Sequence, residues 1–134
     1  MVVHFPIALI MTGFLADLIY LFWKKDPCIT KAGFWLMLLG TLGAAAALLT
    51  GIYFTSHPSE GEIAGVFERH ETGALTALVI MALGSALRIY LVSAKKEQPL
   101  LKWAVFGFYL AGVAAVSYTG FLGGSMVFDY MVGL

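Results

Sequence analysis

The amino-acid sequence predicts an all-α fold, namely an integral membrane four-helix bundle with up-down-up-down topology. Hydrophobic residues make up 60% of the 134 residues and charged residues only 12%, with a mean hydropathy of +0.89. A soluble domain of this length has too much exterior to bury so much apolar surface. The apolar residues also fall into four runs separated by short polar stretches, and each run is long enough to cross a bilayer as a helix.

The four runs differ in how they begin and end. The first run starts almost at the N-terminus and ends where Lys24, Lys25, Asp26 and Pro27 follow. The second carries small residues at helical spacing, which let membrane helices approach closely, and the third follows the most polar stretch of the chain. The fourth follows a second short charged loop. The predicted spans cover residues 2–23, 32–56, 72–92 and 101–122, within one transmembrane domain over residues 1–134; the small residues are Gly40, Ala44, Ala47 and Gly51.

The basic residues predict an orientation. Seven of the eight basic residues flank the first and third loops, and Arg69 is the exception. Because cytoplasmic loops are enriched in Lys and Arg, we expect both loops in the cytoplasm of a prokaryotic cell, and both termini outside its inner membrane. The formal net charge of 0 excludes a generally basic surface for nucleic acid. The seven residues are Lys24, Lys25, Lys31, Arg88, Lys95, Lys96 and Lys102.

Three histidines fall on the outer side of this topology: His4, His57 and His70. Neighbouring helices pack about 8–10 Å apart, so the first and third spans of a square bundle lie roughly 13 Å apart. Two imidazoles that reach across this diagonal could bracket one haem iron, a common ligation in membrane cytochromes. The sequence therefore predicts one haem b with His4 and His70 as axial ligands. The alternative is that both are interfacial residues at the water boundary.

Other metals would need other ligands. Tetrahedral zinc is not satisfied by two histidines, so a zinc or copper site would recruit His57 or an acidic residue such as Glu68, Glu71 or Asp129. We interpret His57 as a surface loop residue; the alternatives are a metal ligand, a partner of a haem propionate or a proton-linked group.

Three glycines end the fourth span on the same outer side: Gly120, Gly123 and Gly124. Glycine has no Cβ, so these positions leave room for a flat ring such as a porphyrin. The alternative is that they permit close packing of helices or end the helix.

Asp17 and Arg88 are a second pair of candidate residues, because each lies about two helical turns inside the cytoplasmic boundary of the membrane. A charge at the centre of a membrane helix costs roughly 2.5–3.5 kcal/mol on insertion scales, and pairing across the bundle would offset much of this cost. We expect a structural ion pair between the first and third spans. The alternative is a proton or quinone-headgroup site, which Tyr20 or Tyr90 could join.

Three segments resemble a known family: VHFPIALIMTGFLADLIY, RHETGALTALVIMALGSALRIYL and TGFLGGSMVFDYMVGL. They are similar to the bacterial and archaeal membrane family catalogued as domain of unknown function 2231. That family has four spans, a histidine at the head of the third and an ending like TGWLGGxLVYxHGVGV. The resemblance implies importance for His4, His70, Gly120, Gly123 and Gly124, and fits a haem-binding or redox-associated role. The family's late histidine falls at Tyr130 here, so no second haem is expected.

These observations predict a small electron-transfer subunit of the membrane rather than an enzyme on its own. Its expected partners are the lipid bilayer and a larger membrane redox complex or further copies of itself, with quinone as a candidate redox partner. Two other functions remain open at this point. The chain could be a non-redox accessory or structural subunit of a larger membrane complex, or an outer-face metal-ion binder.

Overall fold

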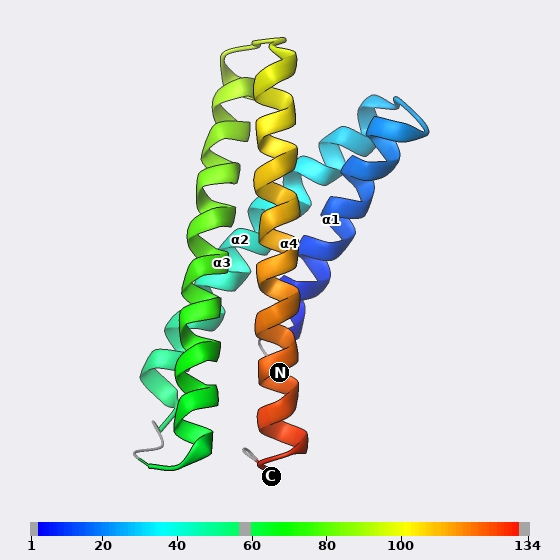
Figure 1. Cartoon of the computed structure of the whole chain (residues 1–134). Coiled ribbons are helices and arrows are strands. Elements are labelled where there is room, and N and C mark those ends of the chain that lie inside the picture. Colours follow the sequence, from blue (N-terminus) through cyan, green and yellow to red (C-terminus); the bar gives the residue numbers. More distant parts are fainter. Residues whose placement is uncertain (1–2, 57–59, 132–134) are drawn as a thin grey trace.

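The computed structural model describes residues 3–56 and 60–131, and this part of the chain contains four helices and no strand. Each helix is long and apolar enough to cross a membrane. The all-α, four-helix prediction is therefore confirmed. The helices are α1 (His4–Phe22), α2 (Pro27–Phe54), α3 (Glu62–Ser93) and α4 (Pro99–Phe128) (Figure 1).

The helices begin and end at residues suited to these positions. The Asp26 carboxylate accepts a hydrogen bond of 2.9 Å from the Cys28 N–H and so caps α2. Proline occupies the first turn of both α2 and α4, where its missing N–H costs nothing. At Gly61, the φ of +95° lies in the region that favours glycine, and α3 starts immediately afterwards.

Three of the helices are longer than the predicted spans, whereas α1 (His4–Phe22) lies within the predicted span of residues 2–23. α3 begins at Glu62, ten residues before the predicted start at Thr72, so much of the polar stretch predicted as a loop is helical. α2 starts five residues early at Pro27, and α4 continues to Phe128. Hydropathy marks where a helix leaves hydrocarbon, whereas the backbone hydrogen bonds continue beyond that boundary into water.

The four helices form two hairpins that cross each other. The α1–α2 and α3–α4 hairpins have their short loops at the upper end of Figure 1, where the hairpins diverge. Between the hairpins, α2 packs against α3 and α1 against α4. In the described part of the chain, α1 and α3 have no direct backbone contact, so they occupy the diagonal positions of the bundle.

The core lies where the hairpins cross. Ile10, Met37, Met81 and Tyr109 are fully buried there, one from each helix. Most other long apolar side chains are exposed on the outer faces of the helices. This distribution suits a protein whose surrounding solvent is hydrocarbon, because lipid and core are equally apolar.

Glycines set the close approach of α1 to α2. A Cβ at Gly40 would lie 2.7 Å from Ile10 Cγ1, and a Cβ at Gly43 would lie 3.2 Å from Pro6 Cβ. Gly51, which the sequence places on the same stripe of small residues as Gly40, instead faces open space. α1 begins at His4 and Gly43 already lies against Pro6, so the last two turns of α2 extend beyond the start of α1, and only the earlier part of the predicted stripe forms the interface.

Gly40→Ala should therefore lower the free energy of unfolding by ~1–3 kcal/mol, the usual cost of overfilling a tight interface. The added methyl group meets both the side chain and the backbone nitrogen of Ile10. Gly51→Ala is the matched control within α2, and alanine there should be neutral or stabilising by up to about 1 kcal/mol through helix propensity. Unfolding of the detergent-solubilised variants measures both, and equal losses in the two would contradict the assigned interface.

Candidate functional site

The His70 side chain, on α3, makes a hydrogen bond to the backbone of α4 near the lower end of the bundle. Its imidazole is half-buried, and Nδ1 lies 3.0 Å from the carbonyl oxygen of Thr119 on α4. A carbonyl oxygen only accepts hydrogen bonds, so Nδ1 is the donor and carries the proton. In the neutral ring the lone pair then lies on Nε2, which is the nitrogen available to a metal or to a proton.

Two glycines allow this contact between α3 and α4. A Cβ at Gly123 would lie 3.2 Å from Cε1 of the His70 ring. On the opposite helix, a Cβ at Gly73 would lie 2.7 Å from Oγ1 of Thr119. Gly123 therefore accommodates the imidazole itself, and Gly73 brings the Thr119 backbone within its reach.

His4 lies on the first turn of α1 and is exposed. Further along α1, the Phe14 ring stacks on Phe106 of α4 with centroids 5.4 Å apart. Ile7 Cδ1 lies 3.8 Å from a Cβ built at Gly120. Residue numbers thus rise along α1 as they fall along α4, so the two helices are antiparallel. One turn before Ile7, His4 falls at the level of Gly123 and hence at the level of His70.

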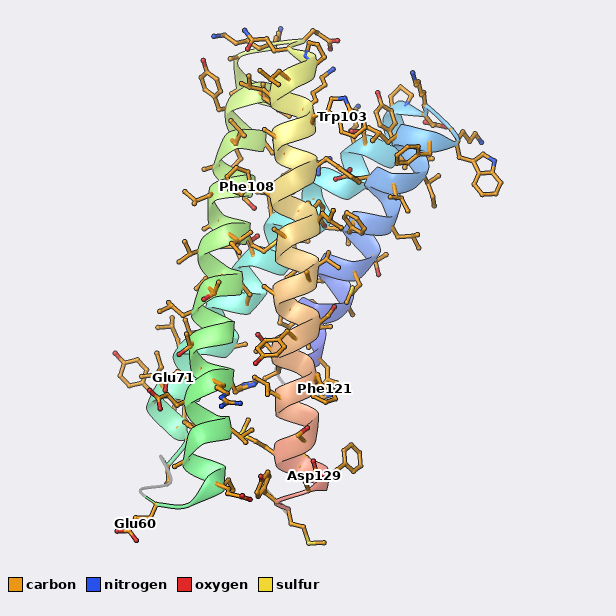
Figure 2. All side chains as sticks on the ribbon, viewed as in Figure 1. Glu60, Glu71, Trp103, Phe108, Phe121 and Asp129 are labelled. Atoms are coloured by element: carbon orange, nitrogen blue, oxygen red, sulfur yellow. The ribbon has the colours of Figure 1, made fainter. Side chains whose placement is uncertain are left out.

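The remaining glycines and possible metal ligands predicted from the sequence do not form a second site with His70. Gly124 faces open space, and Gly120 meets only the end of the Ile7 side chain. His57 lies outside the described residues. Within residues 3–56 and 60–131, no three His, Cys, Asp or Glu side chains come together as a metal-ligand group. Glu71 and Asp129 lie toward the lower end of the bundle with Glu60 (Figure 2).

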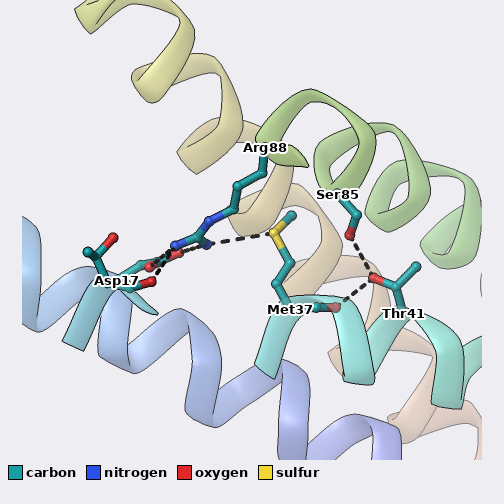
Figure 3. A network of polar contacts seen from close by, with 6 residues as sticks. Asp17, Met37, Thr41, Ser85 and Arg88 are labelled. Carbon is teal, nitrogen blue, oxygen red and sulfur yellow. Dashed lines mark hydrogen bonds and ion pairs between the residues drawn. The ribbon is translucent and has the colours of Figure 1, made fainter. Parts of the chain in front are cut away.

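The predicted pair between Asp17 and Arg88 is present in the structure (Figure 3). The guanidinium binds the carboxylate through two hydrogen bonds, Nη1 to Oδ2 at 2.5 Å and Nη2 to Oδ1 at 2.8 Å. Nη2 also donates to the Thr30 carbonyl oxygen of α2 at 3.2 Å. Because only 10% of the Arg88 side chain and 13% of the Asp17 side chain are exposed, the charges neutralise each other away from solvent.

The surroundings of Arg88 belong largely to α2. Met37 Sδ lies 3.7 Å from Nη1, and the Phe34 ring centroid lies 6.0 Å from the guanidinium carbon. Gly33 leaves the space that the Asp17 carboxylate fills, since a Cβ there would overlap it. A hydrogen bond also joins α2 to α3 one helical turn from Met37, where the Thr41 and Ser85 hydroxyl oxygens are 2.9 Å apart (Figure 3).

Tyr109 is the tyrosine that sequence reasoning missed. Its side chain is fully buried, and its hydroxyl has no hydrogen-bond partner among the described residues. The hydroxyl lies over Gly13, one turn before Asp17 on α1. Tyr90, which the sequence suggested, instead accepts a hydrogen bond from Lys96 at 2.8 Å near the surface.

The chain matches, over residues 1–134, the family described as "Predicted membrane protein (DUF2231)". The chain belongs to this family. The match spans all four helices and includes both His4 and His70, as the resemblance in the sequence indicated. No curated protein and no solved structure matches the chain significantly. Membership therefore establishes a membrane protein with four apolar helices, and leaves its activity to be argued from the site.

Replacing either partner of the ion pair should cost ~3–5 kcal/mol of unfolding free energy, because the remaining charge stays buried without its partner. Asp17→Leu and Arg88→Leu are the single variants. The double variant Asp17→Leu/Arg88→Leu should lose clearly less unfolding free energy than the two single variants added together, since it leaves no lone charge. Denaturant unfolding in detergent measures the three free energies.

The prediction is tested by the interaction energy, which is the difference between the loss of the double variant and the summed losses of the two single variants. If the losses of unfolding free energy were strictly additive, Asp17 and Arg88 would not form a direct ion pair. Lys102→Gln provides the control, because Lys102 pairs with Glu97 on the exposed surface at 3.2 Å and its loss should change stability by less than about 1 kcal/mol.

Proposed function

We propose that this integral membrane protein is an electron-transfer subunit that binds one haem b, with His70 and His4 as the axial ligands. The observation that carries the proposal is the hydrogen bond between His70 Nδ1 and the Thr119 carbonyl oxygen. Histidines that bind metals commonly donate their second ring N–H to a carbonyl or carboxylate, which fixes both the tautomer and the ring orientation. His70 meets this requirement from a half-buried position inside an apolar bundle.

The neighbouring residues support the same assignment. His4 comes from the helix diagonal to α3 and lies at the level of His70, as two axial ligands from opposite helices require. Gly120 and Gly124 lack side chains on the intervening α4, and Gly124 faces open space. The bound haem would supply a one-electron couple. The protein's own residues would orient the two imidazoles, present Nε2 of His70 to the iron through the Thr119 hydrogen bond, and exclude water through the surrounding apolar side chains.

A subunit of this kind needs partners. One redox centre at one end of the bundle does not reach across a hydrocarbon core of about 30 Å, so a larger membrane redox complex or a further copy must accept the electron. Quinone is the candidate donor. The excess of lysines at the hairpin loops supports a cytoplasmic upper end, and supports termini outside the inner membrane of a prokaryotic cell.

The visible absorption spectrum of the purified protein in detergent tests the proposal. Protein produced with haem available should show a Soret band and, after reduction, sharp α and β bands. His70→Ala and His4→Ala should each lose the reduced low-spin bands, since each removes one axial imidazole. His57→Ala is the matched control and should keep them.

Two outcomes would contradict the proposal. A colourless protein that still assembles with membrane partners would favour a non-redox accessory subunit. Zinc or copper at a stoichiometric level, retained in His70→Ala but lost in His57→Ala, would favour a metal-ion binder. Gly51→Ala, where the added methyl group would meet nothing within 4 Å, controls for loss of cofactor through a general effect of substitution.

A further inference from the structure

A polar groove lies between α3 and α4 in the lower half of the bundle, and both helices line it (Figure 1). Its volume is about 380 Å³, within the range of about 300–1,000 Å³ that small-molecule sites occupy. Gly73 of α3 and Ala115 of α4 are its half-buried residues. Lipid chains make no hydrogen bonds, so polar side chains here favour a ligand with polar groups of its own. The polar lining residues are Glu68, Arg69, Thr72, Thr76 and Tyr118.

The groove adjoins the contact that holds His70. Gly73 lines the groove and also packs against α4, because a Cβ at Gly73 would lie 2.7 Å from Thr119 Oγ1. The Thr119 carbonyl oxygen accepts the hydrogen bond from His70. Tyr118, the residue before Thr119, lines the groove. A ligand in the groove would therefore lie beside the histidine, between the same two helices.

The charges at the outer end of the groove favour an uncharged ligand. Glu68 and Arg69 are both exposed there, and their opposite charges give the lining no net charge. Acidic residues outnumber Arg69 at this end of the bundle, which disfavours an anionic headgroup. The guanidinium donates hydrogen bonds and the carboxylate accepts them. Together they suit a hydroxyl group, which does both.

Thr76 sets a more specific requirement deeper in the groove. Its hydroxyl donates a hydrogen bond of 2.8 Å to the Thr72 carbonyl oxygen, so Thr76 Oγ1 offers a ligand only its lone pairs. The ligand must then carry a hydrogen-bond donor one turn inside the predicted span. The ester oxygens of a phospholipid only accept hydrogen bonds, so they do not meet this requirement.

The spacing of these groups suits a ring with hydroxyls at opposite ends. Arg69 and Thr76 line the same groove and are separated by two helical turns, or roughly 10.5 Å along α3. A six-membered ring with para hydroxyls, together with a hydrogen bond of about 2.8 Å at each end, spans roughly 11 Å. Such a ring fits between the two residues, against the side chains of Thr72 and Tyr118.

We propose that this groove binds the headgroup of a quinol. One hydroxyl binds Arg69 and Glu68, the other donates to Thr76, and the apolar tail extends into the hydrocarbon. A quinone has carbonyl groups in place of both hydroxyls and lacks the hydrogen bond to Thr76, so the groove prefers the reduced form. This inference rests on the electron-transfer role proposed above, for which quinone is the candidate donor, and it assigns the donor a site.

Fluorescence quenching by decylubiquinone, a short-tailed quinone, tests the groove in detergent. Trp23→Phe/Trp35→Phe/Trp103→Phe/Tyr118→Trp places the only tryptophan in the groove, and its indole N–H keeps a donor there. Quenching of this tryptophan should saturate. The matched control, Trp23→Phe/Trp35→Phe, keeps Trp103 at the opposite end of the bundle (Figure 2). Quenching of Trp103 should rise linearly with concentration, because only dissolved quinone collides with it.

Decylubiquinol should displace the quinone and bind about ten-fold more tightly, the effect of one additional hydrogen bond. Thr76→Val should abolish this preference, because valine has the shape of threonine without its oxygen. Thr76 is exposed, so the fold should be unaffected. Thr50→Val is the matched control and should keep the preference: its hydroxyl also donates to a backbone carbonyl, at 2.9 Å, but Thr50 does not line the groove.

Three results would overturn the proposal. They are linear quenching of the tryptophan in the groove, equal affinities for quinol and quinone before Thr76 is changed, and an unchanged preference in Thr76→Val. Absorption spectra of the same samples separate this inference from haem binding. Saturable quinol binding by a colourless protein supports the groove and contradicts the haem, whereas haem bands with linear quenching support the haem and contradict the groove.

Discussion

The ion pair between Asp17 and Arg88 is the interaction on which the arrangement of the helices depends. α1 and α3 have no backbone contact in the described part of the chain, yet this pair joins them, and the Thr30 carbonyl adds α2 to the same group. Hydrocarbon does not solvate a lone charge, so separating the partners is far more costly than at a wet surface. The pair is satisfied only when three helices meet in one register, and that register also sets which glycines face which side chains.

The level of the histidines follows from the same register. His4 begins α1 and His70 lies in the third turn of a long α3, so nothing local relates their positions along the bundle axis. They fall together because Phe14 and Ile7 fix α1 against α4, while Gly73 and Gly123 fix α3 against α4. The bundle thus has two distinct ends. One carries lysines and diverging hairpins, and the other carries His4, His70, most of the acidic side chains, the start of α1 and the end of α4.

Hydropathy and charge predicted the four spans and the two partners of the ion pair, because both signals reflect the cost of placing a residue in hydrocarbon. The remaining ligands of Arg88 were not predictable. A backbone carbonyl at Thr30 and a sulfur at Met37 have no sequence signature, and their positions depend on how the hairpins cross. The same is true of Tyr109, whose hydroxyl meets Gly13 across the interface. The hydrogen bond of His70 to Thr119 likewise required the register of α3 against α4.

Electron paramagnetic resonance of the oxidised, haem-loaded protein tests the central claim most directly, since the spin state of ferric haem reports its axial ligands. Two imidazoles, from His4 and His70, should give a low-spin ferric signal, and His4→Ala should convert it to a high-spin signal with His70 retained. A high-spin signal in the protein with both histidines, or no ferric haem signal at all, would contradict the account.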